Sequence, residues 1–145
     1  MRIIDADGHV DEKNIPWAEL LGEPYRNRAP RVVQDNRGIP FIMMEGKLTP
    51  KPAGKACSFV GAPRSHHPQE TTGMTDPHQR LKDMDLEGID TAVLFGTSPF
   101  LSLPFVEDKD FACAVARVYN NWLQGYCKAD PRRLKGVAAV AIQDP

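Results

Sequence analysis

Two residues near the start of the chain, Asp7 and His9, have the types and the spacing of a metal-binding pair. They belong to the segment Asp5-Ala6-Asp7-Gly8-His9, which follows a short β-branched apolar run. Because side chains alternate along an extended segment, those of Asp5, Asp7 and His9 can lie on one face. A carboxylate and an imidazole so close in the chain suit a divalent metal such as Zn²⁺ or Mn²⁺. From spacing alone, a loop-capping aspartate beside a surface histidine is the commoner alternative, since two-residue matches often arise by chance.

Weaker candidates follow this segment and the next predicted strand. Glu12 could accept a hydrogen bond from His9 and orient its ring from outside the ligand set, although a solvated loop carboxylate is the commoner alternative. Thr97, Ser98 and Phe100 come directly after the second predicted strand. There they could line a substrate pocket, and simple turn formation is an equal alternative.

Three apolar strands are predicted to carry these residues, at 2–5, 89–95 and 134–142. Two helices are predicted to lie between them. The helix at 77–87 has Asp76 as its N-cap and Gly88 as its stop.

Gln79, three residues after that N-cap, completes a capping-box pattern. The second helix, at 108–126, is indicated by apolar and aromatic residues at helical spacing over about four turns.

An insertion separates the first strand from the first of these helices. The apolar runs at 32–33 and 39–44 flank a turn-like segment and predict a β-hairpin, which Pro40 should confine to a sheet edge. Residues 49–73 carry many prolines, glycines and polar residues without a clear period, and they predict a long surface loop.

Apolar strands that alternate with amphipathic helices indicate a parallel sheet and an α/β fold. No G-x-G-x-x-G follows the first strand, which counts against a dinucleotide-binding fold. Periodicity alone leaves an open doubly wound sheet and a closed barrel as alternatives. A (β/α)₈ TIM barrel needs about 250 residues, so three strands would be fewer than half of one.

Four segments together resemble the amidohydrolase-related family: residues 4–10 with Glu12, residues 80–85 ahead of 88–90, residues 119–122, and residues 130–134. The likeness extends along the chain except for about 49–73. It implies a metal-binding (β/α)₈ TIM barrel, of which residues 1–145 would be the N-terminal part, with about three strands and two main helices. Members of that family include decarboxylases of aminocarboxymuconate semialdehyde and of resorcylate, and hydrolases of lactone or ester bonds.

By this resemblance Asp7 takes the place of the family's first metal-ligand histidine, and His9 takes the place of the second. A carboxylate is harder than an imidazole, so the metal preference moves from zinc towards Mn²⁺ or Mg²⁺. The family's other ligands, two histidines and an aspartate, lie on later strands. His66, His67 and His78 come too early in the barrel order to replace them.

The expected function is that of a metal-dependent hydrolase or decarboxylase acting on a small organic acid, ester or lactone. The alternative is a noncatalytic remnant or an interaction module, and the chain by itself is expected to be inactive. Arg80 and Asp85 are expected in ion pairs at a helix surface or between a helix and a loop, without catalytic duty.

Composition narrows the class of protein further. With a net charge of -1 the chain lacks a basic field for nucleic acid, and no apolar run approaches the length of a membrane helix. The first residues turn acidic at once, unlike a secretory signal, so a cytoplasmic location is expected. The three cysteines, at positions 57, 113 and 127, do not form a disulfide framework. The expected partners are a small-molecule substrate and further copies of the chain.

Overall fold

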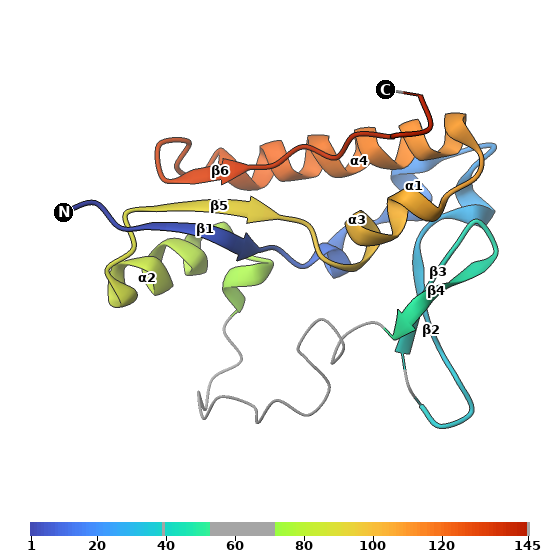
Figure 1. Ribbon diagram of the computed structural model, residues 1–145, viewed down its shortest axis with the longest axis horizontal. Coiled ribbons are helices and arrows are strands. Elements are labelled where there is room, and N and C mark those ends of the chain that lie inside the picture. The colour runs from blue at the N-terminus through green and yellow to red at the C-terminus, as the bar shows by residue number, and fades with distance from the viewer. Residues whose placement is uncertain (39, 53–71, 145) are drawn as a thin grey trace.

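A parallel sheet of three strands is the centre of the computed structural model, which describes residues 1–38, 40–52 and 72–144. The strands β1 (Ile4–His9), β5 (Thr91–Phe95) and β6 (Leu134–Gly136) lie side by side in that order and run in the same direction (Figure 1). Helix α2 (Pro77–Glu87) precedes β5, and helix α4 (Lys109–Cys127) precedes β6. The predicted α/β class and the predicted order of strands and helices are therefore confirmed.

The remaining elements are shorter and lie mostly in the insertion and after β5. They are η1 (Glu12–Asn14), α1 (Trp17–Leu21), η2 (Arg26–Arg28), β2 (Arg31–Gln34), β3 (Pro40–Met44), β4 (Lys47–Pro52), η4 (Thr72–Met74), α3 (Ser98–Ser102) and η5 (Leu103–Phe105). None of the described helices is both long enough and apolar enough to cross a membrane.

Helix α2 has the bounds that its sequence predicts. The Asp76 carboxylate accepts a hydrogen bond from the backbone N–H of His78 at 2.9 Å, and Gly88 ends the helix with a φ of 73°. Gln79 departs from the predicted capping box, because its amide donates to Asp83 one turn along the helix at 2.8 Å. The N-cap and the glycine stop are enough to set the two ends.

Helices α2 and α4 cover one face of the parallel sheet. Ala92 and Leu94 of β5 are fully buried on that face and alternate with half-buried Thr91, Val93 and Phe95. The two helices are neighbours, because the Tyr126 hydroxyl of α4 donates to the carbonyl of Gly73 just before α2. We call the opposite side of the sheet, which carries Val93 and Phe95, the uncovered face.

Gly136 shows how closely α4 approaches the covered face. It pairs with Leu94, and a Cβ atom at position 136 would lie 2.7 Å from side-chain atoms of Leu123 on α4. A glycine is required there because any side chain would push the helix away from the sheet.

The first strand is longer than predicted. Instead of ending at Asp5, β1 continues to His9 through a bulge between Asp5 and Gly8. At the bulge the Asp5 carboxylate accepts a hydrogen bond from the backbone N–H of Asp7 at 3.1 Å, which satisfies a group that the ladder leaves free. Asp7 and His9 therefore lie on the strand itself.

The last strand is shorter than the predicted 134–142. Regular pairing ends at Gly136, and one more backbone bond joins Val137 to Leu94 at 2.9 Å. Beyond that point the neighbouring strand β5 has ended, and Asn120 of α4 replaces it as the partner. Its amide donates to the carbonyl of Ala139 at 2.9 Å and accepts from the N–H of Ala139 at 2.7 Å.

The insertion forms an antiparallel sheet in the order β2-β3-β4. The predicted hairpin is confirmed, but the expectation that Pro40 confines it to an edge is wrong. Pro40 is the first residue of the central strand, a position that tolerates the missing N–H. Strand β4 occupies residues predicted as loop, because prolines 50 and 52 hide its signal. Residues 53–71 of that predicted loop lie outside the described residues.

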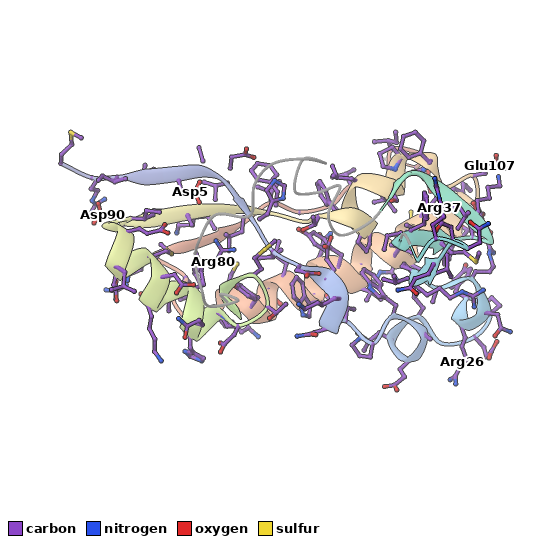
Figure 2. The ribbon with its side chains drawn as sticks, turned by 90° about the horizontal axis from the view of Figure 1, so that it is seen from below. Asp5, Arg26, Arg37, Arg80, Asp90 and Glu107 are labelled. Atoms are coloured by element: carbon purple, nitrogen blue, oxygen red, sulfur yellow. The ribbon has the colours of Figure 1, made fainter. Side chains whose placement is uncertain are left out.

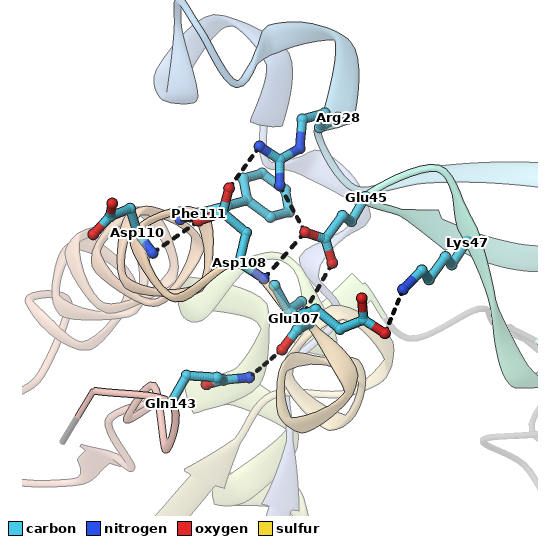
Figure 3. A network of polar contacts seen from close by, with 9 residues as sticks. Arg28, Glu45, Lys47, Glu107, Asp108, Asp110, Phe111 and Gln143 are labelled. Carbon is cyan, nitrogen blue, oxygen red and sulfur yellow. Dashed lines mark hydrogen bonds and ion pairs between the residues drawn. The ribbon is translucent and has the colours of Figure 1, made fainter.

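A network of charged side chains joins this insertion to the start of α4 (Figure 3). The Arg28 guanidinium donates to Glu45 at 2.6 Å and to Asp108 at 2.8 Å, and it lies 4.6 Å from the centre of the Phe111 ring. Glu45 also accepts hydrogen bonds from the backbone N–H groups of Glu107 and Asp108, at 2.9 and 3.2 Å. The turn between β3 and β4 is thereby fixed against the first residues of α4.

Candidate metal centre

Asp7 and His9 lie together at the carboxyl end of β1. Nε2 of His9 is 3.8 Å from Oδ1 of Asp7, and the two side chains are 40% and 89% exposed. His9 pairs with Phe95 of β5, whose ring centre is 6.3 Å away, so the imidazole belongs to the uncovered face. The carboxyl ends of parallel strands are where enzymes of this architecture carry their chemistry.

The structure fixes which nitrogen of His9 is available to a ligand. Nδ1 lies 3.2 Å from the carbonyl oxygen of Gly96. Because a carbonyl oxygen only accepts hydrogen bonds, Nδ1 carries the proton in this contact and Nε2 keeps its lone pair. Nε2 is the nitrogen that faces Asp7. A histidine bound to a metal usually has this arrangement, with its other ring nitrogen donating to a carbonyl.

The backbone around His9 is held from two further elements. Arg80 reaches from α2 toward β1, where its guanidinium donates to the carbonyl of His9 and, at 3.1 Å, to the carbonyl of Gly73 (Figure 2). The Thr97 hydroxyl donates to the carbonyl of Val10. The ion pair predicted for Arg80 is not found among the described residues, where its guanidinium donates to backbone carbonyls instead.

Asp85, by contrast, forms the predicted ion pair, with Arg133 at 2.6 Å. No pattern in the sequence marks the contact between Arg80 and His9, because the two residues are 71 positions apart.

Glu12 is a buried carboxyl group behind this site, with 1% of its surface exposed. Oε1 accepts hydrogen bonds from the backbone N–H groups of Thr97 at 2.9 Å and Phe100 at 3.3 Å. Oε2 is buried and has no hydrogen-bond partner among the described residues. Burial, helped by the smaller effect of the Asp11 charge, raises the pKa of Glu12 to about 7, against the lowering effect of the backbone hydrogen bonds.

The predicted contact of Glu12 with His9 is replaced by a different pair of contacts. The acceptor for His9 is the carbonyl of Gly96, and the Glu12 carboxylate holds the residue that follows, Thr97. The two side chains therefore meet the same turn from opposite sides. A contact across 85 residues cannot be found from local spacing.

Two of the three residues predicted to line a pocket, Thr97 and Phe100, make their contacts within the protein. Thr97 is buried, with its N–H and its hydroxyl both bonded to protein groups. Phe100 is half-buried and packs against the Tyr119 ring at 5.4 Å between centres. The side chain of Ser98 lies outside the described part of the structure. Of the two alternatives for Thr97, these contacts favour the turn.

The other histidines do not join the pair. His66 and His67 lie outside the described residues, and His78 is exposed in the first turn of α2. Within residues 1–38, 40–52 and 72–144, no group of three or more histidine, cysteine, aspartate or glutamate residues could hold a metal ion. Asp7 and His9 thus offer two ligands, and a complete centre needs at least one more from outside these residues.

Comparison with solved structures identifies the fold. An amidohydrolase from Mycobacterium avium subsp. paratuberculosis superposes with a TM-score of 0.66 and 15% identity over 94% of this chain. The 5-carboxyvanillate decarboxylase from Novosphingobium aromaticivorans, complexed with manganese and 4-hydroxy-3-methoxy-5-nitrobenzoic acid, gives a TM-score of 0.53 and 24% identity over 99% of this chain. A mutant of the same decarboxylase, also with bound manganese, gives the same values.

The chain shares the fold of part of this amidohydrolase and part of this decarboxylase. The parallel α/β architecture is thereby confirmed, and the complete (β/α)₈ barrel stays a prediction. This chain spans 42% of the amidohydrolase and 35% of the decarboxylase, so it corresponds to part of their barrels. No protein-family model matches the chain, and no curated protein matches it.

Proposed function

We propose that this chain is part of a metal-dependent hydrolase or decarboxylase of the amidohydrolase superfamily. The observation that carries the proposal is the Asp7 and His9 pair at the carboxyl end of β1, with Nε2 of His9 left free by the bond from Nδ1 to Gly96. The shared fold supports it, as does the manganese bound in the decarboxylase. The expected substrate is a small organic acid, ester or lactone.

The donor atoms of the pair fit a divalent metal of intermediate hardness. Nε2 of His9 would supply a neutral nitrogen ligand and the exposed Asp7 carboxylate a hard oxygen ligand, a combination suited to Mn²⁺ as well as Zn²⁺. When bound, the metal would supply a Lewis acid that polarises a substrate carboxylate or a water molecule. The Gly96 carbonyl keeps the His9 ring in place, and Arg80 keeps its backbone in place.

Substitution of either ligand tests the proposal. We expect Asp7→Ala and His9→Ala to weaken Mn²⁺ binding at least tenfold in a titration followed by electron paramagnetic resonance, because each removes one of two ligands. His78→Ala and Asp110→Ala are matched controls, since both side chains are exposed on helices, and they should bind Mn²⁺ as the unsubstituted chain does. Unchanged binding in both ligand variants would remove the assignment.

Product analysis separates hydrolysis from decarboxylation. A panel of aromatic acids, esters and lactones is incubated with Mn²⁺ and with protein containing the further βα units of the barrel. Release of CO₂ identifies a decarboxylase, and release of a new carboxylic acid identifies a hydrolase. With two protein ligands among the described residues, this chain by itself should hold metal weakly and show no turnover. Metal binding without either product in the longer protein would favour the noncatalytic alternative.

A further inference from the structure

We propose that Glu12 is a positioning residue for the metal ligand His9, acting through the turn formed by Gly96 and Thr97. The inference rests on the proposed function, because it gives Glu12 a part in the same centre. It concerns a residue that does not touch the metal, and its test can be read without metal.

The first step is the hold of Glu12 on the turn. Its Oε1 accepts from the N–H of Thr97 at 2.9 Å and from the N–H of Phe100 at 3.3 Å. These amides belong to the start of α3, where backbone N–H groups have no partners within the helix. The carboxylate of Glu12 therefore caps α3 from a distant part of the chain and fixes the backbone that leads into it.

The second step is the contact between this carboxylate and Gly96. A Cβ atom at position 96 would lie 2.7 Å from Oε1 of Glu12 and would overlap Cβ of Phe100. Only glycine allows so close an approach. The peptide unit between Gly96 and Thr97 thus lies against the carboxylate, and it carries the carbonyl that meets His9.

The third step leads from the turn to the ring. The carbonyl of Gly96 accepts the Nδ1 proton of His9 at 3.2 Å. Arg80 holds the carbonyl of His9, and its contact therefore fixes the backbone and leaves the ring free to turn. The ring orientation and the tautomer that frees Nε2 depend on the position of the Gly96 carbonyl, and Glu12 sets that position.

The unsatisfied oxygen of Glu12 favours a positioning role over a purely stabilising one. Oε2 is buried with no partner among the described residues, and an unpaired buried polar atom costs stability. A carboxyl group that is kept buried although it lowers stability needs an explanation. The hydrogen bonds that Oε1 accepts from the turn next to His9 provide one.

The test reads the tautomer of His9 from ¹⁵N chemical shifts of histidine-labelled protein without metal, with the His9 signal assigned by its loss in His9→Ala. In the unsubstituted chain we expect the proton on Nδ1. Glu12→Met keeps the size of the side chain and removes the acceptor, so it should give a mixture of tautomers and a Mn²⁺ affinity 10–100-fold lower. Glu12→Gln keeps an acceptor oxygen and should preserve both properties.

Asn120→Ala is the matched control for a general loss of stability. Asn120 also makes two hydrogen bonds to backbone, on Ala139, and the variant leaves every contact of Glu12 in place. It should keep the tautomer of His9 while unfolding more easily. If Glu12→Met does not fold, Glu12→Asp replaces it, because the shorter side chain cannot reach both N–H groups.

Four results would overturn the proposal: a proton on Nε2 of His9 in the unsubstituted chain, an unchanged tautomer in Glu12→Met or Glu12→Asp, loss of the tautomer in Glu12→Gln, or its loss in Asn120→Ala. Failure of the proposed function has a different signature. In that case the tautomers respond as expected, and the protein that contains the further βα units does not bind Mn²⁺.

Discussion

At the scale of single residues, burial and hydrogen bonding act on the carboxyl group of Glu12 in opposite directions, and burial is the stronger. Burial raises its pKa from near 4.5 to about 7. The folded protein therefore keeps a proton between these pH values that the unfolded chain has released. The stabilisation is fully present below pH 4.5 and is lost as the pH rises through about 7, with a size on the order of 3 kcal/mol.

We expect Glu12→Gln to remove this dependence. The free energy of unfolding of the unsubstituted chain should fall relative to Glu12→Gln between pH 4.5 and 8, as measured by urea unfolding at several pH values. Glu19→Gln is the control, because Glu19 is exposed on α1 and remains in water in both states. A constant difference between the chain and Glu12→Gln over this range would show that Glu12 is not buried as described.

Glu45 presents the opposite case, with the same residue type in a different environment. Burial alone would raise its pKa, but the N–H groups of Glu107 and Asp108, together with the Arg28 guanidinium, lower it. Its stabilisation is therefore present above the usual value near 4.5 and is lost on acidification. We expect Glu45→Gln to be less stable than the unsubstituted chain at pH 7, and the difference to shrink towards pH 3 in thermal unfolding.

The pH dependence of stability should have opposite signs in the two glutamine variants, each measured relative to the unsubstituted chain. If Glu45→Gln and Glu12→Gln changed with pH in the same direction, the network of Figure 3 would not hold an ionised carboxylate.

The residues of the candidate site can be predicted from the sequence to different degrees. Asp7 and His9 can be named because alternation along a strand is local. The partners of Glu12, Arg80 and Thr97 cannot, because these contacts join segments that are 71 to 87 positions apart in the chain. The sequence nevertheless marks Glu12 as a residue near the site, and only its contact is wrong.

At the scale of elements, the helices are predictable and the strand ends are not. Helix α2 carries its N-cap and its stop in its own sequence, at Asp76 and Gly88, so its bounds follow without tertiary information. The length of β6 instead depends on where the neighbouring strand β5 ends. The apolar run 134–142 contains no information on where the partner strand ends, so the strand predicted from it is longer than the observed β6.

Asn120 determines the path of the chain after β6, and its removal should be costly. Asn120→Ala leaves the N–H and the carbonyl of buried Ala139 without partners, so we expect a loss of about 1–3 kcal/mol in the free energy of unfolding. Asn121→Ala is the matched control, since Asn121 is the adjacent residue and is exposed, and it should change stability by less than about 0.5 kcal/mol. Equal effects in urea unfolding would contradict the role of Asn120.

At the scale of the whole molecule, the parallel sheet is covered on one side only within the described residues. The covered face buries Ala92 and Leu94 beneath α2 and α4. The uncovered face carries the candidate ligands, and half-buried Val93 and Phe95 beside them. In a closed barrel this side is the packed interior. The uncovered face that carries Asp7 and His9 thus also leaves the side chains of Val93 and Phe95 partly in contact with water.

We expect the isolated chain to self-associate through this surface and the adjoining sheet edge. The segment after β6 alternates between buried Ala139 and Ala141 and exposed Val140 and Ile142, which are 62% and 64% exposed. Such apolar surface beside an outer strand favours association with another chain. Sedimentation velocity at several protein concentrations should show dimers or larger species, and the double variant Val140→Lys, Ile142→Lys should shift the distribution towards monomer.

Leu86→Lys is the control, because Leu86 is equally apolar and 86% exposed but lies on α2, on the other side of the sheet, and it should leave the distribution unchanged. A chain that remains monomeric at all concentrations, or one that responds to Leu86→Lys alone, would show that this surface does not mediate association.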